Sequence, residues 1–339
     1  MEDEELWDFD SESLSFEKDR HVLYLEMMYQ LLPAPYQGQE INRLTLAYFV
    51  ISGLDIFGAL DRIDKEAVIN WVLSLQAHPK NDRTFENGEA ARLNGSHLAS
   101  TYCALAILKT VGYDLSQIDS EVLLKSMKTL QQPNGCFMPI HTGGETDLRF
   151  VFCAAAICSM LKNWTGMDCE KAKEFIRNCQ SYDGGFGLIP GAESHGGATY
   201  CAVASLKLMG FLGEDLLSEK ASSNVINVPL LLDWSLQKQA FEDGGFRGRA
   251  NKPTDTCYAF WVGGTLRILQ ADKFINEEAL RGFLLTCQSK YGGFSKFPRL
   301  FPDIYHSYYG FCAFSMLREP GLNPLCVELG ISAIAAIGL

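Results

Sequence analysis

Three residues in the second half of the chain carry side chains that bind zinc in other proteins. Asp255 and Cys257 are two positions apart, and His306 follows further along. Zinc accepts carboxylate, thiolate and imidazole ligands, and a site with three protein ligands keeps a fourth position open for chemistry. The alternative is that Cys257 is a buried thiol and Asp255 a helix cap. Residue types alone leave both interpretations open.

Basic side chains lie just before Asp255 in the sequence, and others lie about 60 residues before it and about 40 residues after it. The group consists of His195, Arg247, Arg249, Lys252 and Lys296. In a chain with a net charge of −12, such a cluster beside helix N-termini favours capture of a phosphate or diphosphate. A solvated basic loop is the alternative. The chain has no P-loop and no glycine-rich dinucleotide motif after a strand, so a nucleotide fold is not indicated.

An internal repeat indicates the elements that position these residues. Segments ending in glutamine recur along the chain, and four of the five are followed by glycine-rich turns and then by runs of small and aromatic residues. The glutamines are Gln76, Gln131, Gln180, Gln237 and Gln288, and the aromatics that align in the runs are Tyr48, Tyr102, Phe152, Tyr200, Tyr258 and Tyr309. The aligned positions recur at intervals of roughly 50 residues, which is typical of repeat architectures.

Each repeat is expected to contain two helices joined by the glycine turn. The first helix has a charged face, as in EKAKEFIRNCQ, and is typical of a solvent-facing helix. The second is apolar on nearly all sides and should be buried. Six such pairs predict an all-α fold, an α/α barrel, as a single domain over residues 1–339, with an acidic extension (1–15) and a C-terminal tail (319–339). A closed ring is favoured over an open solenoid, which usually needs polar terminal repeats.

In a closed ring the buried helices point their N-termini at one rim, so the residues just before each aligned aromatic should meet there. Five positions upstream lie His97, Asp147 and His195. Three positions upstream lie Thr45, Ala99, Arg149, Gly197, Asp255 and His306. The repeat therefore gathers histidines, carboxylates and an arginine at one rim.

Aromatic side chains are abundant on the predicted inner helices. They are Tyr48, Phe49, Tyr102, Phe150, Phe152, Tyr200, Tyr258, Trp261, Tyr308 and Tyr309. Inside a ring they either fill the middle or line a deep pocket suited to a long hydrocarbon. Zinc, an anion site and such a pocket together suggest a reaction between a thiol and a lipid diphosphate.

Composition narrows the classes of function. The 339 residues are 47% hydrophobic and 21% charged, and the negative net charge argues against a general nucleic-acid binder. Eleven scattered cysteines predict reduced thiols in a cytosolic protein. The acidic start is not that of a secretory signal, and no run reaches the ~18 apolar residues of a membrane span, so we expect a cytoplasmic location.

The segments that carry these residues resemble protein prenyltransferase β subunits. They are ESHGGATYC (193–201), GGFRGRANKPTDTCYAFW (244–261) and FPDIYHSYYG (301–310), and the similarity extends from about residue 16 to about residue 318. The resemblance implies an α/α barrel that pairs with a helical-repeat α subunit as a heterodimer. It also implies one zinc ion per β subunit and transfer of an isoprenoid from its diphosphate to the cysteine of a C-terminal C-a-a-X sequence, in proteins such as small GTPases.

Within this family, Thr45, Phe49 and Lys296 resemble the type I branch, which uses geranylgeranyl diphosphate. Thr45 occupies the position of a bulky tryptophan in farnesyltransferases, and it leaves room for a twenty-carbon chain. Lys296 occupies the position of their magnesium-binding aspartate, which implies that magnesium is not required. Targets ending in Leu or Phe are then expected. Tyr305 departs from this pattern and is farnesyltransferase-like, and the segment Pro79–Asn94 is shorter than in animal chains.

The resemblance also implies roles for individual residues. The zinc ligands are Asp255, Cys257 and His306. The residues that bind the diphosphate or stabilise it as it leaves are His195, Gly196, Gly197, Arg249, Lys252, Tyr258 and Lys296. Lipid-contacting positions are Thr45, Phe49 and Trp261, and the peptide is read by His97, Ala99, Arg149 and Phe150.

Four alternatives stay open. A farnesyltransferase β subunit shares every catalytic residue except the discriminating positions, and Tyr305 favours it. A Rab-type geranylgeranyltransferase β subunit is less well supported, because Arg149 resembles the residue found in the enzymes that act on C-a-a-X sequences. A terpene cyclase would need a D-x-D-D acid motif, which this sequence lacks. A non-enzymatic helical scaffold would not need the three predicted zinc ligands on one rim, so bound zinc distinguishes the two.

Overall fold

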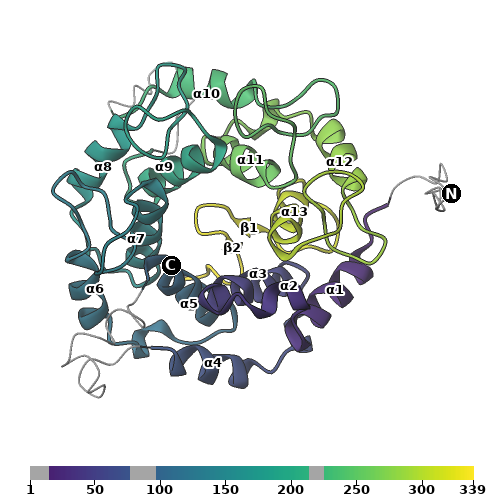
Figure 1. The fold of residues 1–339 in the computed structure, drawn as a ribbon, viewed down its shortest axis with the longest axis horizontal. Helices are drawn as coiled ribbons and strands as arrows, with labels where there is room; N and C mark the ends of the chain where they lie inside the picture. Colours follow the sequence, from purple (N-terminus) through teal and green to yellow (C-terminus); the bar gives the residue numbers. More distant parts are fainter. Residues whose placement is uncertain (1–14, 77–96, 214–224) are drawn as a thin grey trace.

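Two concentric layers of helices form a closed ring in the computed structural model, which describes residues 15–76, 97–213 and 225–339 (Figure 1). Within these residues the inner layer consists of α3 (Arg43–Ile56), α5 (Leu98–Thr110), α7 (Leu148–Met160), α9 (Gly196–Leu208), α11 (Tyr258–Ile268) and α13 (Ile304–Met316). The outer layer consists of α1 (Lys18–Gln30), α4 (Lys65–Ser74), α6 (Ser120–Lys128), α8 (Cys169–Asn178), α10 (Val228–Leu236) and α12 (Glu277–Thr286). The predicted all-α toroid is confirmed.

Short elements connect or close the layers. They are α2 (Ala34–Gln37), the 3-10 turns η1 (Glu40–Asn42), η2 (Leu60–Arg62), η5 (Leu115–Gln117) and η6 (Asp272–Phe274), and the strands β1 (Leu325–Cys326) and β2 (Ile331–Ser332). The strands pair antiparallel. No helix among the described residues is long and apolar enough to cross a membrane.

The pattern of apolar residues decides which layer each helix joins. Along α7 nearly every side chain is buried, because both of its sides face other helices. Along α8 burial is confined to Ala172, Phe175 and Ile176, which share one helix face at i, i+3 and i+4 spacing. Burying the continuous apolar surface of the inner helices is the main stabilising contribution to the ring.

Repeat glutamines tie each repeat to the next. The side chain of Gln180 donates to the carbonyl of Gly184 in its own turn and accepts from the backbone N–H of Asn227, the N-cap of the next outer helix, at 2.8 Å. Gln131 makes the same connection to Asp168. Gln288 accepts from the backbone N–H of Glu17 at 3.0 Å, so the last repeat is joined to α1 and the ring closes.

One predicted member of this glutamine set is wrong. Gln239, not Gln237, bonds to Gly244 and to the next N-cap, Asn276, whereas Gln237 bonds to Asp233 within its own helix. The turn in this repeat is one residue longer than in the others, so the glutamine stands seven rather than six positions before its phenylalanine.

Two of the aromatic residues aligned between repeats, called here the aromatic column, were wrongly chosen. In three repeats a side chain accepts a hydrogen bond from the backbone N–H two residues on and lies five residues before the column residue; these side chains are His97, Asp147 and His195. Asp255 makes the same bond to Cys257, which places Phe260 rather than Tyr258 in the column. Asp303 caps α13 and lies five residues before Tyr308, so Tyr308 rather than Tyr309 belongs to the column. Several aromatic residues in succession made both alignments ambiguous.

The C-terminal residues occupy the middle of the ring (Figure 1). Tyr102 donates to the carbonyl of Leu329 and Tyr200 to that of Val327, both at 2.7 Å. Tyr48 and Tyr308 both donate to the carbonyl of Gly330. The segment that the sequence suggested as a tail is thus packed against the column of aromatic residues.

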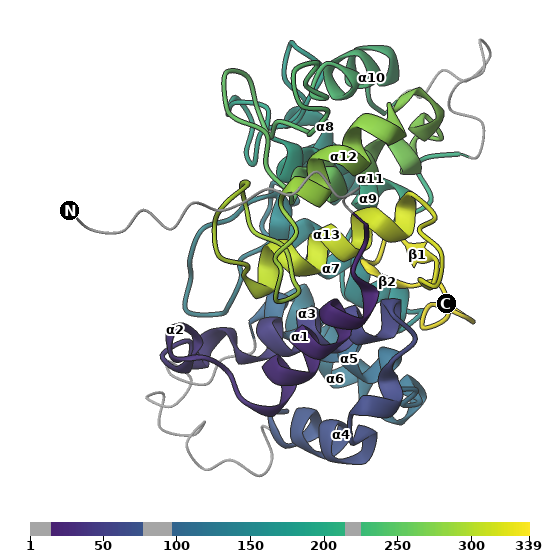
Figure 2. The ribbon, with the colours of Figure 1, turned by 90° about the vertical axis from the view of Figure 1, so that its right-hand side faces the viewer.

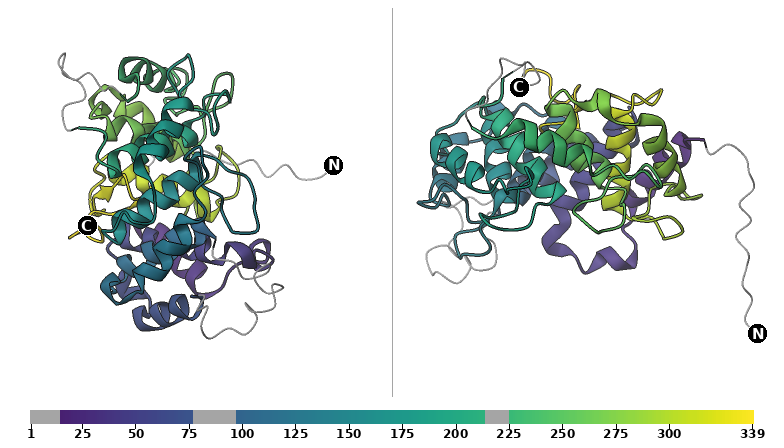
Figure 3. Two further views of the ribbon diagram at one scale, coloured as in Figure 1. Left: turned by 90° about the vertical axis from the view of Figure 1, so that its left-hand side faces the viewer. Right: turned by 90° about the horizontal axis from the view of Figure 1, so that it is seen from above.

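The two ends of the ring differ. Figures 2 and 3 show α2 and the long loops that lead into the inner helices at one end, and the β1–β2 pair with the C-terminus at the other. The rim that carries the N-termini of the inner helices is therefore the end away from the C-terminal residues. The acidic residues 1–14 and the segment Pro79–Asn94 lie outside the described residues.

Candidate active site

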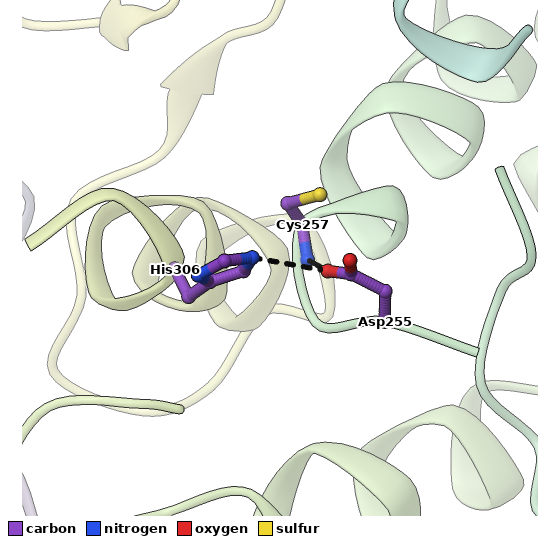
Figure 4. Close-up of side chains that lie close together, drawn as sticks. All are labelled: Asp255, Cys257 and His306. Atoms are coloured by element: carbon purple, nitrogen blue, oxygen red, sulfur yellow. Dashed lines mark hydrogen bonds and ion pairs between the residues drawn. The ribbon is translucent and has the colours of Figure 1, made fainter. Parts of the chain in front are cut away.

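The three predicted zinc ligands lie together at the loop-bearing rim (Figure 4). Asp255 precedes α11, Cys257 is its N-cap, and His306 lies in the first turn of α13. Their ligand atoms all lie within 4.8 Å of one another. The Nε2 atom of His306 is 3.3 Å from Oδ1 of Asp255, which also accepts from the backbone N–H of Cys257 at 3.0 Å.

Backbone hydrogen bonds between repeats bring the two helix ends together. The N–H of Thr256 donates to the carbonyl of Lys296 at 3.2 Å, and its hydroxyl donates to the carbonyl of Ser295 at 2.7 Å. The equivalent bond from Gly196 to the carbonyl of Gly248 joins the preceding pair of repeats. Residues distant in sequence are thus fixed side by side at the rim.

Asp303 orients the imidazole of His306. The Nδ1 atom of His306 lies 2.6 Å from Oδ2 of Asp303, so Nδ1–H donates to the carboxylate and leaves Nε2 facing Asp255. Histidine ligands of metals usually make such a second bond, which fixes the tautomer. Sequence reasoning missed Asp303. Its signal was its place three residues before the predicted ligand histidine, in a position where aspartate caps helices.

Burial and hydrogen bonds shift the pKa values of all three residues. Burial raises the pKa of Asp255, but hydrogen bonds from His306 and Cys257 outweigh it and hold that pKa below its usual value. Burial lowers the pKa of His306, yet its bonds to Asp255 and Asp303 raise it to about 9. Burial, and then the Asp255 carboxylate, raise the pKa of the Cys257 thiol. A carboxylate, a thiol and an imidazole that converge in a buried place fit zinc.

His195 and Tyr258 form a hydrogen-bonded pair beside this cluster. The Nδ1 atom of His195 accepts from the N–H of Gly197 at 3.1 Å, so the ring proton is on Nε2. That Nε2 lies 2.9 Å from the hydroxyl oxygen of Tyr258 and donates to it. Burial, and next the charge of Arg249, lower the pKa of His195 and keep the ring neutral. The hydroxyl proton of Tyr258 is then available to another acceptor.

The other predicted anion-binding residues have different neighbours. Arg249 bonds to Glu193 at 2.8 Å, and Lys252 is exposed on the loop that follows. The Nζ atom of Lys296 lies 3.7 Å from Oδ2 of Asp255, whereas the backbone N–H of Cys257 donates to the other carboxylate oxygen, Oδ1. A Cβ at Gly248 would collide with the ring of Tyr258, so glycine is needed for this close approach.

Aromatic contacts extend from the candidate metal-binding residues into the ring. The Nε1 of Trp261 donates to the hydroxyl of Tyr305 at 3.1 Å, and the ring of Tyr305 contacts His306 at 4.9 Å between centroids. Phe49 packs edge-on against Tyr305 at 5.8 Å. Thr45 is half-buried on α3 and accepts a weak hydrogen bond from the Cys103 thiol at 3.7 Å. Thr45 and Phe49 thus lie one helical turn apart on α3 but have different neighbours.

The predicted peptide-reading residues are adjacent to one another on α5 and α7. The rings of His97 and Phe150 are 5.7 Å apart, and the guanidinium of Arg149 lies 5.5 Å from the Phe150 ring. Arg149 is held by Asp147 at 2.6 Å and by Glu145 at 2.9 Å. Asp147 therefore fixes both the start of α7 and the direction of Arg149, a role that the sequence did not reveal. Ala99 donates its backbone N–H to His97.

Known proteins resemble this chain over nearly its whole length. The family model of the prenyltransferase alpha-alpha toroid domain matches residues 16–331. The geranylgeranyl transferase type-1 subunit beta of Arabidopsis thaliana is 63% identical over 97% of this chain and 92% of that protein. That of Dictyostelium discoideum is 33% identical over 94% of this chain and 96% of that protein. A solved structure, Candida albicans protein geranylgeranyltransferase-I complexed with GGPP, shares the fold with a TM-score of 0.81 at 23% identity, covering 95% of this chain and 97% of that one.

Proposed function

This chain belongs to the prenyltransferase family of α-α toroid proteins, and from that premise we propose that it is the catalytic β subunit of a zinc-dependent protein geranylgeranyltransferase of type I. Its substrates are geranylgeranyl diphosphate and proteins that end in C-a-a-X with Leu or Phe last. Its partner is a prenyltransferase α subunit. The observation that carries the proposal is the convergence of Asp255, Cys257 and His306 next to the His195–Tyr258 pair.

Zinc held by Asp255, Cys257 and His306 would supply a Lewis acid that keeps a substrate thiol in its thiolate form. Asp303 serves this site by holding the His306 ring with Nε2 directed at the metal position. In the reaction the thiolate sulfur forms a bond to the first carbon of the isoprenoid. The bond from that carbon to the diphosphate oxygen breaks, and the diphosphate leaves with the electron pair.

The chain's own residues stabilise the charge that develops on the leaving group. His195 donates to the Tyr258 oxygen, so that the Tyr258 hydroxyl can donate to a diphosphate oxygen. Arg249, Lys252 and Lys296 add positive charge at the same rim. Donors that are already oriented before the reaction stabilise the transition state at little reorganisation cost. Lys296 takes the place of a divalent metal in this account, so magnesium is not required.

A farnesyltransferase β subunit is the second candidate. The observation that favours it is Tyr305, whose ring contacts both Phe49 and His306 and so narrows the space beside the metal cluster. The 63% identity to a type-1 geranylgeranyl transferase subunit, together with a threonine at position 45, favours the first candidate.

Metal analysis of the heterodimer tests the catalytic centre. The complex of this chain with an α subunit should contain one zinc ion, and Cys257→Ala should lose both the zinc and the transfer activity. Cys158→Ala is the matched control, because Cys158 is a buried thiol within α7. Zinc and activity that persist in Cys257→Ala would refute the site.

A further inference from the structure

In two of the glycine turns, an aspartate accepts a hydrogen bond from a hydroxyl side chain. The residue that carries this hydroxyl directly precedes a residue of the candidate active site. In one turn, Oδ1 of Asp183 accepts from the N–H of Gly185 at 3.2 Å and from the hydroxyl of Ser194 at 2.5 Å. Ser194 is followed by His195. The turn of the next repeat has the same bonds at equivalent positions, and there the residue that follows is Asp255.

In this second turn one carboxylate binds both strands of the loop. Oδ1 of Asp243 accepts from the N–H of Gly245 at 3.0 Å, and Oδ2 accepts from the hydroxyl of Thr254 at 2.6 Å. Thr254 is buried, whereas Asp243 lies on the exposed turn. Arg247 and Thr254 also pair across the loop as an antiparallel bridge. The hydroxyl bond therefore fixes the end of the loop directly ahead of Asp255.

The position of Asp255 matters because its carboxylate is the link between the other two metal-site residues. It accepts from the backbone of Cys257 at 3.0 Å and faces Nε2 of His306 at 3.3 Å. Metal–ligand distances in proteins lie within about 0.2 Å of their standard values. Thr254 is joined directly to Asp255 in the chain, so the Asp243–Thr254 bond bears on where the Asp255 carboxylate lies.

We propose that Asp243 is a positioning residue of the metal site, which acts by holding Thr254 and thereby Asp255. This inference rests on the proposed function for the presence of zinc. Asp183 holds His195 in the same way, but His195 is not a predicted metal ligand. These two bonds are equivalent in place, but the Asp243–Thr254 bond supports a predicted metal ligand and the Asp183–Ser194 bond does not.

The Asp243–Thr254 pair lies behind the metal site rather than in it. Both residues line a cleft of about 500 Å³ whose wall also includes Pro253, Phe283 and Phe297. Phe283 belongs to the outer helix α12, and none of the three metal-site residues lines the cleft. An effect of Asp243 on zinc therefore acts through Thr254 and Asp255.

The test measures zinc affinity by competition with a chromophoric chelator, using the full chain in complex with its α subunit. Asp243→Ala and Thr254→Val should each weaken zinc binding by roughly 10- to 100-fold, the range for residues that orient metal ligands. The double variant should be no weaker than Asp243→Ala, because that substitution already removes the bond that Thr254→Val removes. Asp243→Asn should retain most of the affinity, since its amide oxygen can accept from Gly245 and its NH₂ can donate to Thr254.

Asp183→Ala and Ser194→Ala are the matched controls and should leave zinc affinity within about twofold of the parent. A merely structural role would lower the melting temperature of both sets alike without separating their zinc affinities. Unchanged zinc affinity in Asp243→Ala and Thr254→Val, or an equal loss in Asp183→Ala, would overturn the proposal. The titration needs no lipid or peptide, so it gives its result even where the transferred group proves to be a different isoprenoid.

Discussion

The Nε2 atom of His195 lies 2.9 Å from the hydroxyl oxygen of Tyr258, although the two residues belong to neighbouring repeats. Because Nδ1 of His195 already accepts from Gly197, the direction of this bond is fixed: the histidine donates and the tyrosine accepts. The Tyr258 proton is left for another acceptor. In the proposed reaction that acceptor is an oxygen of the leaving diphosphate.

Removal of that hydroxyl should slow the chemical step. Tyr258→Phe is expected to lower the single-turnover rate of lipid transfer by roughly 10- to 100-fold, since one oriented donor to the leaving group is lost. Zinc content should stay unchanged. Tyr102→Phe is the control, because it removes a hydroxyl that bonds to the carbonyl of Leu329 instead. Equal rates for Tyr258→Phe and the parent would contradict the role of this pair.

The size of the residue at position 45 should decide whether the enzyme selects the fifteen-carbon or the twenty-carbon lipid diphosphate. Thr45 is half-buried on the inner helix α3 and contacts Cys103. Thr45→Trp fills space on this side of the ring and should shift the preference from the twenty-carbon to the fifteen-carbon diphosphate in a competition assay. Thr45→Val, which keeps the size and removes the hydroxyl, should keep the parent's preference. A tryptophan variant that still selects the twenty-carbon lipid would refute this assignment.

Gly330 should be essential for packing the C-terminal residues into the ring. It has a φ of +64°, and a Cβ there would meet the hydroxyls of Tyr48 and Tyr102. Gly338 has a φ of +80° but no atom within 4 Å of the position that a Cβ would take. The substitution Gly338→Ala therefore measures the cost of backbone strain alone. Gly330→Ala should destabilise the chain by about 1–3 kcal/mol more than Gly338→Ala. Chemical unfolding measures the difference, and equal losses would contradict the packing role.

Stability should fall in acid because of His21. This residue is fully buried where the last repeat meets α1; its Nδ1 accepts from the N–H of Gly293, and its Nε2 bonds to Gln288. Burial lowers its pKa from 6.5 to about 4, despite the bond to Gln288 and the charge of Glu17, which raise it. The unfolded chain binds a proton at higher pH than the folded chain does.

The contribution of His21 is therefore complete above pH 6.5 and is lost as the pH falls from 6.5 toward 4, by up to about 3 kcal/mol. The free energy of unfolding as a function of pH measures this slope. His21→Phe should reduce the slope within that range, whereas a substitution at the exposed His141 should not. A shallower slope of the same sign remains, because burial also lowers the pKa of His97 and His195. A slope in His21→Phe equal to that of the parent would assign the acid sensitivity to another group.

The sequence predicted the features that repeat and missed those that depend on contacts between distant residues. Apolar periodicity separates inner from outer helices, and it placed Asp255 and His306 on one rim correctly. It could not choose between Tyr258 and Phe260 in the aromatic column, because both are aromatic and two residues apart. The helix cap settles that choice, and a cap is defined by a hydrogen bond rather than by a pattern.

The residues that support the site illustrate the same limit. Asp303, Asp147 and Asp243 are common residue types in turns and caps, and their roles follow from which atom each one faces. Likewise, nothing in the composition of residues 319–339 predicts that the carbonyls of Leu329 and Gly330 meet tyrosine hydroxyls in the middle of the ring. Such contacts depend on ring closure.

The choice between geranylgeranyl and farnesyl transfer is tested most directly by a competition assay. The chain, in complex with a prenyltransferase α subunit, would receive equal amounts of fifteen-carbon and twenty-carbon diphosphates and of peptides ending C-a-a-Leu and C-a-a-Ser, with and without magnesium. Our account predicts transfer of the twenty-carbon lipid to the Leu peptide at a rate that magnesium does not change. Magnesium-dependent transfer of the fifteen-carbon lipid to the Ser peptide would contradict it.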